Sequence, residues 1–210
     1  MNTSIDKFPS PCLDDLYGRY PALTVCKDSI AAACGLLLDC FMSGGKVLVC
    51  GNGGSAADAE HIVGELLKSF RKKRSLPEDV AERLGPDLAS SLEGSLPAVS
   101  LVSMSAMMSA FANDVCWENV FAQETLALAR PCDVLIVLST SGNSKDCVAA
   151  AKVMKAVGGR SLALTGSARS QLSDICDVTV MVPETETFKV QELHLPVYHA
   201  ICAWLEDSLF

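Results

Sequence analysis

Long apolar runs and an excess of basic charge are both missing from this sequence. The longest apolar stretch, residues 30–38, is far shorter than the roughly 20 residues of a membrane-spanning helix, and Asp39 ends it. Lys and Arg number 17 against 25 Asp and Glu, and this net charge of −8 argues against a direct nucleic-acid partner. The first residues contain no apolar signal core. We therefore expect a soluble, cytoplasmic protein that binds neither nucleic acid nor membrane.

Paired cysteines are also missing, although cysteine itself is abundant. The 10 cysteines are scattered singly, with no C-x-x-C pair, and most lie in apolar runs. This pattern predicts buried free thiols in a reducing compartment instead of a disulfide framework. Hydrophobic residues make up 50% of the chain and charged residues 20%, which is typical of a globular protein. At 210 residues, the chain predicts a single domain, residues 1–210.

The most informative stretch joins a short apolar run to a glycine-rich turn. Residues 47–50 are long enough for a buried parallel strand, and Gly51, Gly53 and Gly54 follow at once. Ser55 then opens a helical pattern. Glycines let backbone N–H groups approach a ligand, and a helix N-terminus offers unpaired donors, so this turn predicts a site for an anion or a polyol. The spacing matches neither the dinucleotide fingerprint nor a Walker A loop.

From residue 46 onward, strand and helix patterns alternate. Such alternation predicts βαβ units with right-handed crossovers, and hence an α/β fold: a three-layer αβα sandwich around a five-stranded parallel sheet. Ligands of such sheets bind at the carboxyl ends of the strands. The predicted strands are residues 47–50, 98–102, 134–138, 162–165 and 178–182. The predicted helices between them are residues 55–71, 103–112, 116–130, 143–157 and 168–175, with a last helix ending near 207.

The N-terminal segment, residues 1–45, precedes this alternation. Prolines at positions 9, 11 and 21 predict an irregular stretch over residues 1–20. A helix follows over residues 23–42, and Ser43-Gly44-Gly45 ends it. Apolar residues lie almost all round this helix, which favours a position between neighbouring elements or subunits.

One inserted segment, residues 72–96, is too long for an ordinary connection between a helix and a strand. Leucines and a valine at helical spacing predict one or two short amphipathic helices within it. We favour a surface excursion. The alternative is a lid or a subunit contact whose basic run, residues 71–74, helps to hold an acidic substrate.

Hydroxyl side chains gather after the third predicted strand, at the start of a helix. Hydroxyls and backbone N–H groups at such a position can cradle a phosphate without an arginine. A serine-rich helix cap would look similar, but four hydroxyls after a buried strand favour phosphate binding. They are Ser139, Thr140, Ser141 and Ser144, around Gly142 and Asn143.

Histidine is scarce, with only 3 in the chain. His61 and Glu65 are four residues apart and share a helix face, while Gln191, His194 and His199 come from the last helix. Two imidazoles, a carboxylate and an amide oxygen can form a four-coordinate Zn²⁺ site. Buried core histidines remain the alternative reading. Pro196 must lie in the first turns of its helix or kink it.

Asn113-Asp114 ends the helix after the second strand. A helix cap and a contact to sugar hydroxyls are both compatible with this pair.

These stretches together resemble the sugar isomerase (SIS) domain family, and within it the phosphoheptose isomerases. The similarity covers nearly all of residues 23–207. The run over residues 139–144 marks the SIS family broadly, whereas His61, Glu65, Gln191 and His199 together are far more specific. The remaining matching residues are those at 50–55, 58–60, 113–114 and 192–194.

The resemblance implies a flavodoxin-like SIS fold and a homotetramer with active sites at subunit interfaces. It implies an aldose–ketose isomerase that converts D-sedoheptulose 7-phosphate to D-glycero-D-manno-heptose 7-phosphate through a cis-enediol. Glu65 and His199 would be the acid–base pair. Zn²⁺ would be held by His61, Glu65, Gln191 and His199. The phosphosugar would be bound by Asn52, Gly53, Gly54, Ser55, Asn113, Asp114, Ser139, Thr140, Ser141, Ser144 and Gln191.

The chain departs from the family pattern at two positions. Ser69 stands where the family has an arginine, and Phe188 where it has an aspartate. Arg71 or a residue of the insert is the candidate replacement for the arginine. The alternative function is a non-catalytic SIS tetramer that senses phosphosugars or associates with the replication initiator. The histidine at position 199, absent from the initiator-associating relative, favours the enzyme.

Overall fold

A five-stranded, all-parallel sheet forms the centre of the computed structural model, which describes residues 11–210. The strand order is β2-β1-β3-β4-β5. The chain therefore runs outward from β1 to β2 on one side and then from β3 to β5 on the other. The strands are β1 (Val47–Gly51), β2 (Ala98–Ser100), β3 (Val134–Leu138), β4 (Arg160–Thr165) and β5 (Val178–Met181).

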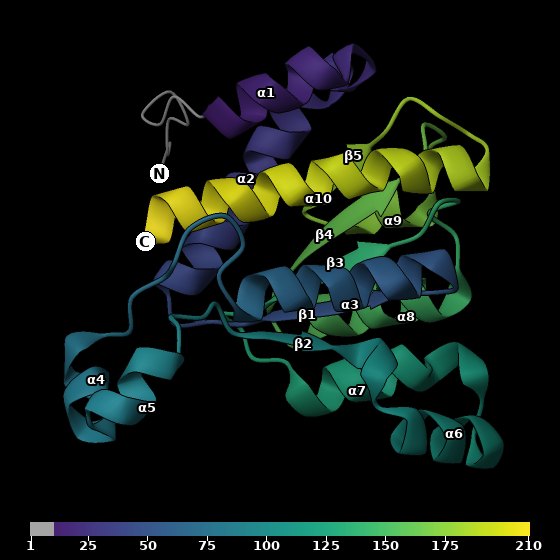
Figure 1. Ribbon diagram of the computed structural model, residues 1–210. Coiled ribbons are helices and arrows are strands. Elements are labelled where there is room, and N and C mark those ends of the chain that lie inside the picture. The colour runs from purple at the N-terminus through teal and green to yellow at the C-terminus, as the bar shows by residue number, and fades with distance from the viewer. Residues whose placement is uncertain (1–10) are drawn as a thin grey trace.

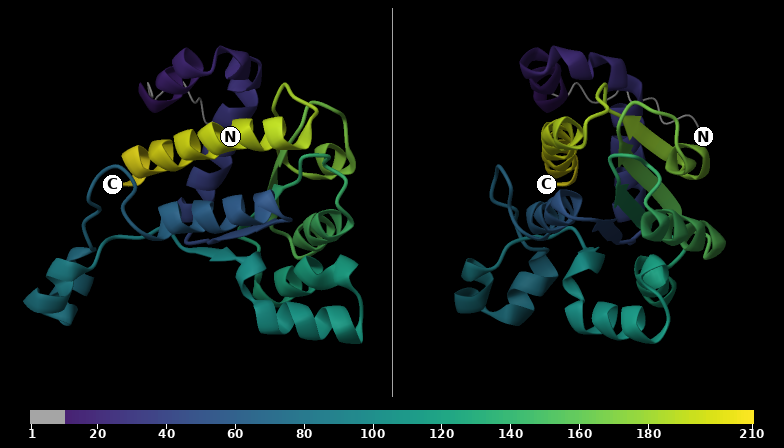
Figure 2. Two further views of the ribbon diagram at one scale, coloured as in Figure 1. Left: turned by 45° about the vertical axis from the view of Figure 1, so that its right-hand side comes forward. Right: turned by 90° about the vertical axis from the view of Figure 1, so that its right-hand side faces the viewer.

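Helices cover both faces of this sheet (Figure 1 and Figure 2). Alternate strand residues point to opposite faces: Val47 and Val49 join one apolar core, and Leu48 and Cys50 join the other. On the first face the helices are α1 (Pro11–Arg19), α2 (Lys27–Met42), α3 (Gly54–Leu67) and α10 (Thr187–Leu209). On the second face they are α6 (Ser105–Asp114), α7 (Val120–Leu128), α8 (Lys145–Ala156) and α9 (Gln171–Ile175). Short 3₁₀ turns are η2 (Pro21–Cys26), η3 (Leu101–Ser103) and η4 (Trp117–Asn119).

The predicted three-layer αβα fold, its five strands and the helices between them are confirmed. Among the described residues, no helix is both long and apolar enough to cross a membrane. The helix α10 continues through Pro196, which lies in its interior. Because proline has no N–H, the carbonyl of Glu192 loses its usual partner one turn back, yet the helix goes on for thirteen further residues as far as Leu209.

The prediction of an irregular stretch over residues 1–20 is wrong for residues 11–19, which form α1; residues 1–10 lie outside the described part. Pro11 occupies the first position of the helix, where the missing N–H costs nothing. Cys12 and Leu16, four residues apart, are buried on the face of α1 that packs on α10. The helix is short, and this tertiary packing outweighs its weak local signal.

Of the one or two short helices predicted in the insert, the structure has two, α4 (Glu78–Leu84) and α5 (Pro86–Ser91). They project from the body of the molecule (Figure 1), and neither contains a buried residue. The start of the insert is different. Arg74 and Glu206 form an ion pair at 2.8 Å, and both side chains are fully buried.

Candidate active site

The glycine turn after β1 (residues 51–54) and the hydroxyl loop after β3 (residues 139–144) lie side by side. Gly51 and Leu138, the last residues of the two strands, are paired in the sheet. The chain continues from β1 toward one edge of the sheet and from β3 toward the other edge. The strand order therefore reverses between these two strands. Open α/β sheets bind their ligands at such a point.

The hydroxyl loop presents a compact polar surface. The Ser139 and Ser144 hydroxyls are 3.0 Å apart, and Ser139 is almost fully buried. Gly142 has φ +65°, and a Cβ atom there would collide with the Ser170 hydroxyl. The loop therefore needs glycine at this position to turn tightly against Ser170 and bring its hydroxyls together.

A side-chain contact joins the glycine turn to the first turn of α8, which follows the hydroxyl loop. The Asn52 amide nitrogen donates to both carboxylate oxygens of Asp146, at 3.0 and 2.9 Å. Asp146 also accepts from the backbone N–H of Cys147 in the first turn of α8. Sequence reasoning missed Asp146. The only signal was its position directly after the hydroxyl loop, where an acidic residue is common in any helix.

Gln191 lies against the other side of the glycine turn. A Cβ atom on Gly54 would come within 2.8 Å of the Gln191 Nε2 atom. Glycine at position 54 therefore leaves the space in which the amide of α10 contacts the N-terminus of α3. Gln191 precedes His199 by eight residues, a rise of about 12 Å along a helix.

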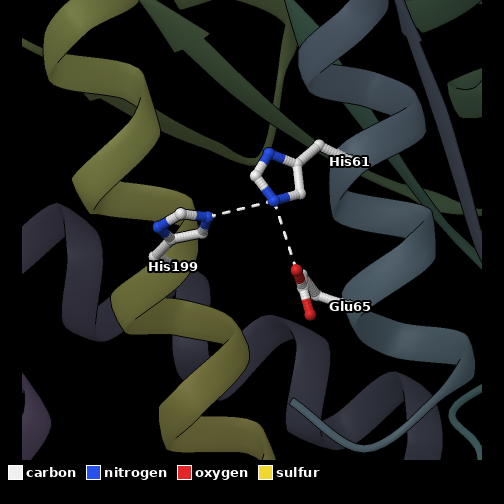
Figure 3. A group of neighbouring side chains, drawn as sticks. All are labelled: His61, Glu65 and His199. Carbon is white, nitrogen blue, oxygen red and sulfur yellow. Dashed lines mark hydrogen bonds and ion pairs between the residues drawn. The ribbon is translucent and has the colours of Figure 1, made fainter. Parts of the chain in front are cut away.

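At the other end of the same two helices, three side chains converge, which we call the triad: His61, Glu65 and His199 (Figure 3). The Nε2 atom of His61 is 3.2 Å from Glu65 Oε1 and 3.3 Å from the Nε2 atom of His199. The first two residues come from α3 and the third from α10, so the packing of these helices assembles the group.

The surroundings of the triad mix aromatic rings with charge. Burial and the nearby His61 lower the pKa of His199, against a smaller opposing effect of Glu65. Lys68 approaches the second Glu65 oxygen at 3.4 Å. Beside His199 opens a cleft of about 420 Å³. Arg19 of α1 and Arg71, at the start of the insert, line it together with Phe70.

The triad has the chemistry of a metal site. One ligand atom from each residue lies within 4.8 Å of the other two, and these atoms are imidazole nitrogens and a carboxylate oxygen. Three acceptors in so small a space repel one another unless a proton or a cation lies between them. This donor set suits Zn²⁺ and other divalent transition metals.

Two predicted sugar-binding residues, Asn113 and Asp114, are not part of this arrangement. Asn113 and Asp114 are exposed at the end of α6 and hydrogen-bond to each other at 2.9 Å. His194 is fully buried in α10, and among residues 11–210 neither of its ring nitrogens makes a well-formed hydrogen bond. Burial lowers its pKa to about 4.

The structure also shows the surroundings of Ser69 and Phe188, the two positions that depart from the family pattern. The Ser69 hydroxyl accepts from the backbone N–H of Arg74, and Phe188 is exposed at the start of α10. Of the basic run, Arg74 is buried in its ion pair, whereas Arg71 reaches the cleft beside His199.

Comparison with known proteins identifies the family. A SIS domain model matches residues 22–166. The chain is 39% identical to the phosphoheptose isomerase of Geotalea daltonii over 181 residues, covering 86% of this chain and 84% of that one. It is 34% identical to the phosphoheptose isomerase of Rhodospirillum rubrum over 184 residues, 88% of each chain. This chain belongs to the phosphoheptose isomerase family of SIS-domain proteins.

Solved structures of the phosphoheptose isomerase family have the same fold. Phosphoheptose isomerase GmhA from Neisseria gonorrhoeae matches with a TM-score of 0.74 at 30% identity, covering 93% of this chain and 94% of that one. The phosphoheptose isomerase from Francisella tularensis matches with a TM-score of 0.72 at 27% identity, covering 93% and 98%. The predicted family, fold and enzyme class are therefore confirmed.

Proposed function

We propose that this enzyme interconverts D-sedoheptulose 7-phosphate and D-glycero-D-manno-heptose 7-phosphate through a cis-enediol. The reaction moves a proton between C1 and C2, far from the phosphate on C7. The observation that carries the proposal is the distance between the hydroxyl loop and the triad. It matches the separation between the phosphate on C7 and the reacting carbons of the sugar. The triad begins at His61, seven residues or about 10 Å along α3 from Gly54, and Gly54 belongs to the glycine turn, which lies beside the hydroxyl loop.

The hydroxyl loop would hold the phosphate through Ser139, Thr140, Ser141 and Ser144. A phosphate dianion there would also meet the N-terminus of α8, whose unpaired N–H groups and dipole favour negative charge. Asn52, Gly53, Gly54, Ser55 and Gln191 would bind the sugar chain between this loop and the triad. The link from Asn52 to Asp146 supports this assignment, because it uses the amide nitrogen of Asn52 and leaves the side-chain amide oxygen as the acceptor for a sugar hydroxyl.

Glu65 and His199 would transfer the proton. They come from different helices, so one can act on the carbon and the other on the sugar oxygens. Burial lowers the pKa of His199, which favours the neutral ring that can accept a proton. The cleft beside His199 gives the reacting end of the sugar a route to this pair.

We assign Zn²⁺ to the triad, with Gln191 as the fourth ligand. When bound, the ion would supply Lewis-acid stabilisation of negative charge on the sugar oxygens. A cation lowers the basicity of a carboxylate that binds it, so we expect the ligand and base roles of Glu65 not to be simultaneous. In this structure the Gln191 side chain contacts Gly54. To reach the ion it would have to change rotamer and extend along α10 toward His199.

A homotetramer with active sites at subunit interfaces would explain the position of Asn113 and Asp114. These residues are exposed at the end of α6, and Val115 and Trp117 beside them are exposed apolar residues, 64% and 49% accessible. An interface over this surface would bury the apolar pair and bring Asn113 and Asp114 into the site of a neighbouring copy.

A proton NMR time course with sedoheptulose 7-phosphate, with and without Zn²⁺, tests the function directly. We expect the anomeric proton of an aldose phosphate to appear, and to appear faster with the metal. No new anomeric signal under either condition would contradict the proposed substrate. It would favour another phosphosugar, with Ser69 and Phe188 the first positions to revert, or the non-catalytic alternative.

A further inference from the structure

His61 can serve as a metal ligand through Nε2 only if its single proton is on the other ring nitrogen. A neutral imidazole has one N–H, and either nitrogen can carry it. In Figure 3 the Nε2 atom of His61 faces Glu65 and His199, while Nδ1 points away from both. The state of Nδ1 therefore decides whether the triad offers three lone pairs or two.

Within residues 11–210, Nδ1 of His61 has one hydrogen-bond partner, the hydroxyl of Tyr198, at 3.0 Å. The same hydroxyl lies 3.1 Å from Asp58 Oδ1. Tyr198 is only 2% accessible, so water competes little for either bond. The hydroxyl thus bridges a carboxylate and an imidazole, both on α3, from its own position on α10.

The direction of these two hydrogen bonds follows from donor and acceptor chemistry. An ionised carboxylate only accepts, so the single hydroxyl proton of Tyr198 is donated to Asp58. The oxygen of Tyr198 can then only accept from His61. Glu65 Oε1, 3.2 Å from Nε2, competes for the same imidazole proton. The contact with Tyr198 is shorter, at 3.0 Å, and Lys68 beside the other Glu65 oxygen weakens that acceptor. The imidazole proton is therefore placed on Nδ1, which leaves the lone pair of Nε2 facing the triad.

Sequence position explains why the chain can build this connection. Asp58 and His61 are three residues apart and lie on one face of α3. Tyr198 directly precedes His199, so its ring and the His199 ring leave α10 about 100° apart. The Tyr198 side chain therefore reaches Nδ1 of His61, and the His199 side chain reaches Nε2. The Tyr198 and His61 rings also pack edge to face, with their centroids 5.5 Å apart.

We propose that Asp58 and Tyr198 are positioning residues that hold His61 as its Nδ1–H tautomer and thereby keep Nε2 open to a divalent cation. The inference rests on the proposed metal site in the triad. It extends that site outward by two residues that touch neither metal nor substrate. Partners of this outer kind fix the orientation and tautomer of ligating histidines in other proteins, and their loss typically weakens metal binding by 10–100-fold.

The first test needs no variant. Long-range ¹H–¹⁵N NMR of the metal-free protein at about pH 8, above the ordinary histidine pKa, reports which nitrogen of each ring carries the proton. The chain has only 3 histidines, so His61→Gln and His194→Gln spectra assign all of the signals. We expect the Nδ1–H tautomer at His61. A spectrum with His61 protonated on Nε2 would overturn the proposal, whatever the enzyme's activity.

The second test removes the hydroxyl. In Tyr198→Phe we expect His61 to become a mixture of tautomers, and the Kd for Zn²⁺, measured by competition with a chromophoric chelator, to rise by about 10–100-fold. Tyr17→Phe is the matched control. It removes another hydroxyl that is buried and, within residues 11–210, has no hydrogen-bond partner. Its tautomer pattern and its Kd should equal those of the wild type.

Asp58→Asn gives a second route should Tyr198→Phe fold poorly. An amide can donate to the Tyr198 oxygen, and the tyrosine proton then turns toward His61 and favours the Nε2–H tautomer. An unchanged tautomer and Kd in a folded variant would overturn the proposal. Failure of the wild type to bind Zn²⁺ would overturn it together with the metal site. Absence of sedoheptulose 7-phosphate turnover with Zn²⁺ binding intact would contradict only the proposed substrate.

Discussion

At the N-terminal end of α3 the groups facing the proposed substrate are mostly neutral, whereas at its C-terminal end they are mostly titratable or charged. The first end consists of backbone N–H groups, serine and threonine hydroxyls, and the amides of Asn52 and Gln191. The second end has the triad, with Lys68 beside Glu65 and the Arg74–Glu206 pair against the last turn of α3. A phosphate dianion can be bound by hydrogen-bond donors alone, without a positively charged side chain. Proton transfer between sugar carbons requires side chains that titrate.

The two ends are also held in place differently. At the first end, Asn52 and Asp146 join the glycine turn to the first turn of α8, which follows the hydroxyl loop. At the second end, Arg74 donates to the carbonyls of Glu65 and Leu66, at 2.8 and 2.7 Å, and Glu206 accepts from the backbone N–H groups of Phe70 and Arg71. Arg74 therefore satisfies carbonyls that the last turn of α3 leaves unpaired. We expect substitutions at the first end to affect substrate binding, and those at the second to affect turnover and stability.

The largest expected effect is on turnover. Glu65→Gln and His199→Ala should each lower kcat by about 10²–10⁴-fold, since each removes a proton-transfer group. Circular dichroism and thermal unfolding should stay close to the wild type, because neither side chain is buried in the core. Steady-state assays with sedoheptulose 7-phosphate measure the change. A wild-type kcat in either variant would contradict the assignment of proton transfer to the C-terminal end of α3.

Stability gives the next effect. Arg74→Met should lower the free energy of unfolding by about 3–5 kcal/mol, because it leaves Glu206 buried without its charged partner. The control is Arg83→Met at the tip of the insert, where the ion pair with Asp79 is exposed and a surface substitution changes stability by about 0.5 kcal/mol or less. Urea unfolding compares the two. Equal losses would mean that the buried pair contributes no more than a surface pair.

Between the two ends, on α10, lies His194, and its pKa makes stability depend on pH. Its folded-state pKa of about 4 is below the ordinary value of 6.5, so the unfolded chain binds a proton first as the pH falls. Stability should therefore drop by about 3 kcal/mol between pH 6.5 and pH 4. His194→Leu should lack this contribution.

The measure for His194 is the difference between variant and wild type in urea unfolding across this range. Burial raises the pKa of Glu124 to about 7, and this carboxyl acts in the opposite direction over an overlapping range. A constant difference between the two proteins from pH 8 to pH 4 would contradict the assignment to His194.

The smallest effect belongs to the neutral end. Ser144→Ala should raise KM for the phosphosugar by about tenfold, the value of one hydrogen bond to a charged group, with kcat little changed. Ser90→Ala, on the exposed surface of the insert, should leave both constants unchanged. A fall in kcat without a change in KM would show that the hydroxyl loop acts on the reacting carbons, and the division between the ends would fail.

Much of the fold could be predicted from the sequence because periodicity and glycine turns are local. The runs after residues 46 and 133 are apolar and β-branched, and each is followed at once by turn residues, so strands β1 and β3 and their loops were evident. The helix α1 was not, since its stability comes from packing on α10. The interpretation of the chain as a single domain stays a prediction.

The candidate site was predicted less evenly. His61, Glu65 and His199 share a cluster as expected, because spacing places the first two on one face and only one other short stretch of the sequence carries histidine. Their roles stay predictions. Asp146 and Tyr198 were missed, and Arg74 was predicted only as part of a basic run that holds an acidic substrate. A polar residue beside a motif looks like any helix cap or surface charge until distant elements are brought together. The function of Arg74 depends on Glu206, which is 132 residues away.

Hydrogen bonds between the two ends of the insert allow the length of the insert to change during evolution. Arg74 and Gly94, near its two ends, are joined by a backbone hydrogen bond of 3.0 Å, and Glu93 accepts from the N–H of Ser69. The ends are thus already closed, and doubling the length of a closed flexible loop costs only about 0.6 kcal/mol. Residues 75–92 can therefore lengthen, shorten or accept a fused tag without moving Glu65, so the length of the insert can change independently of the chemistry.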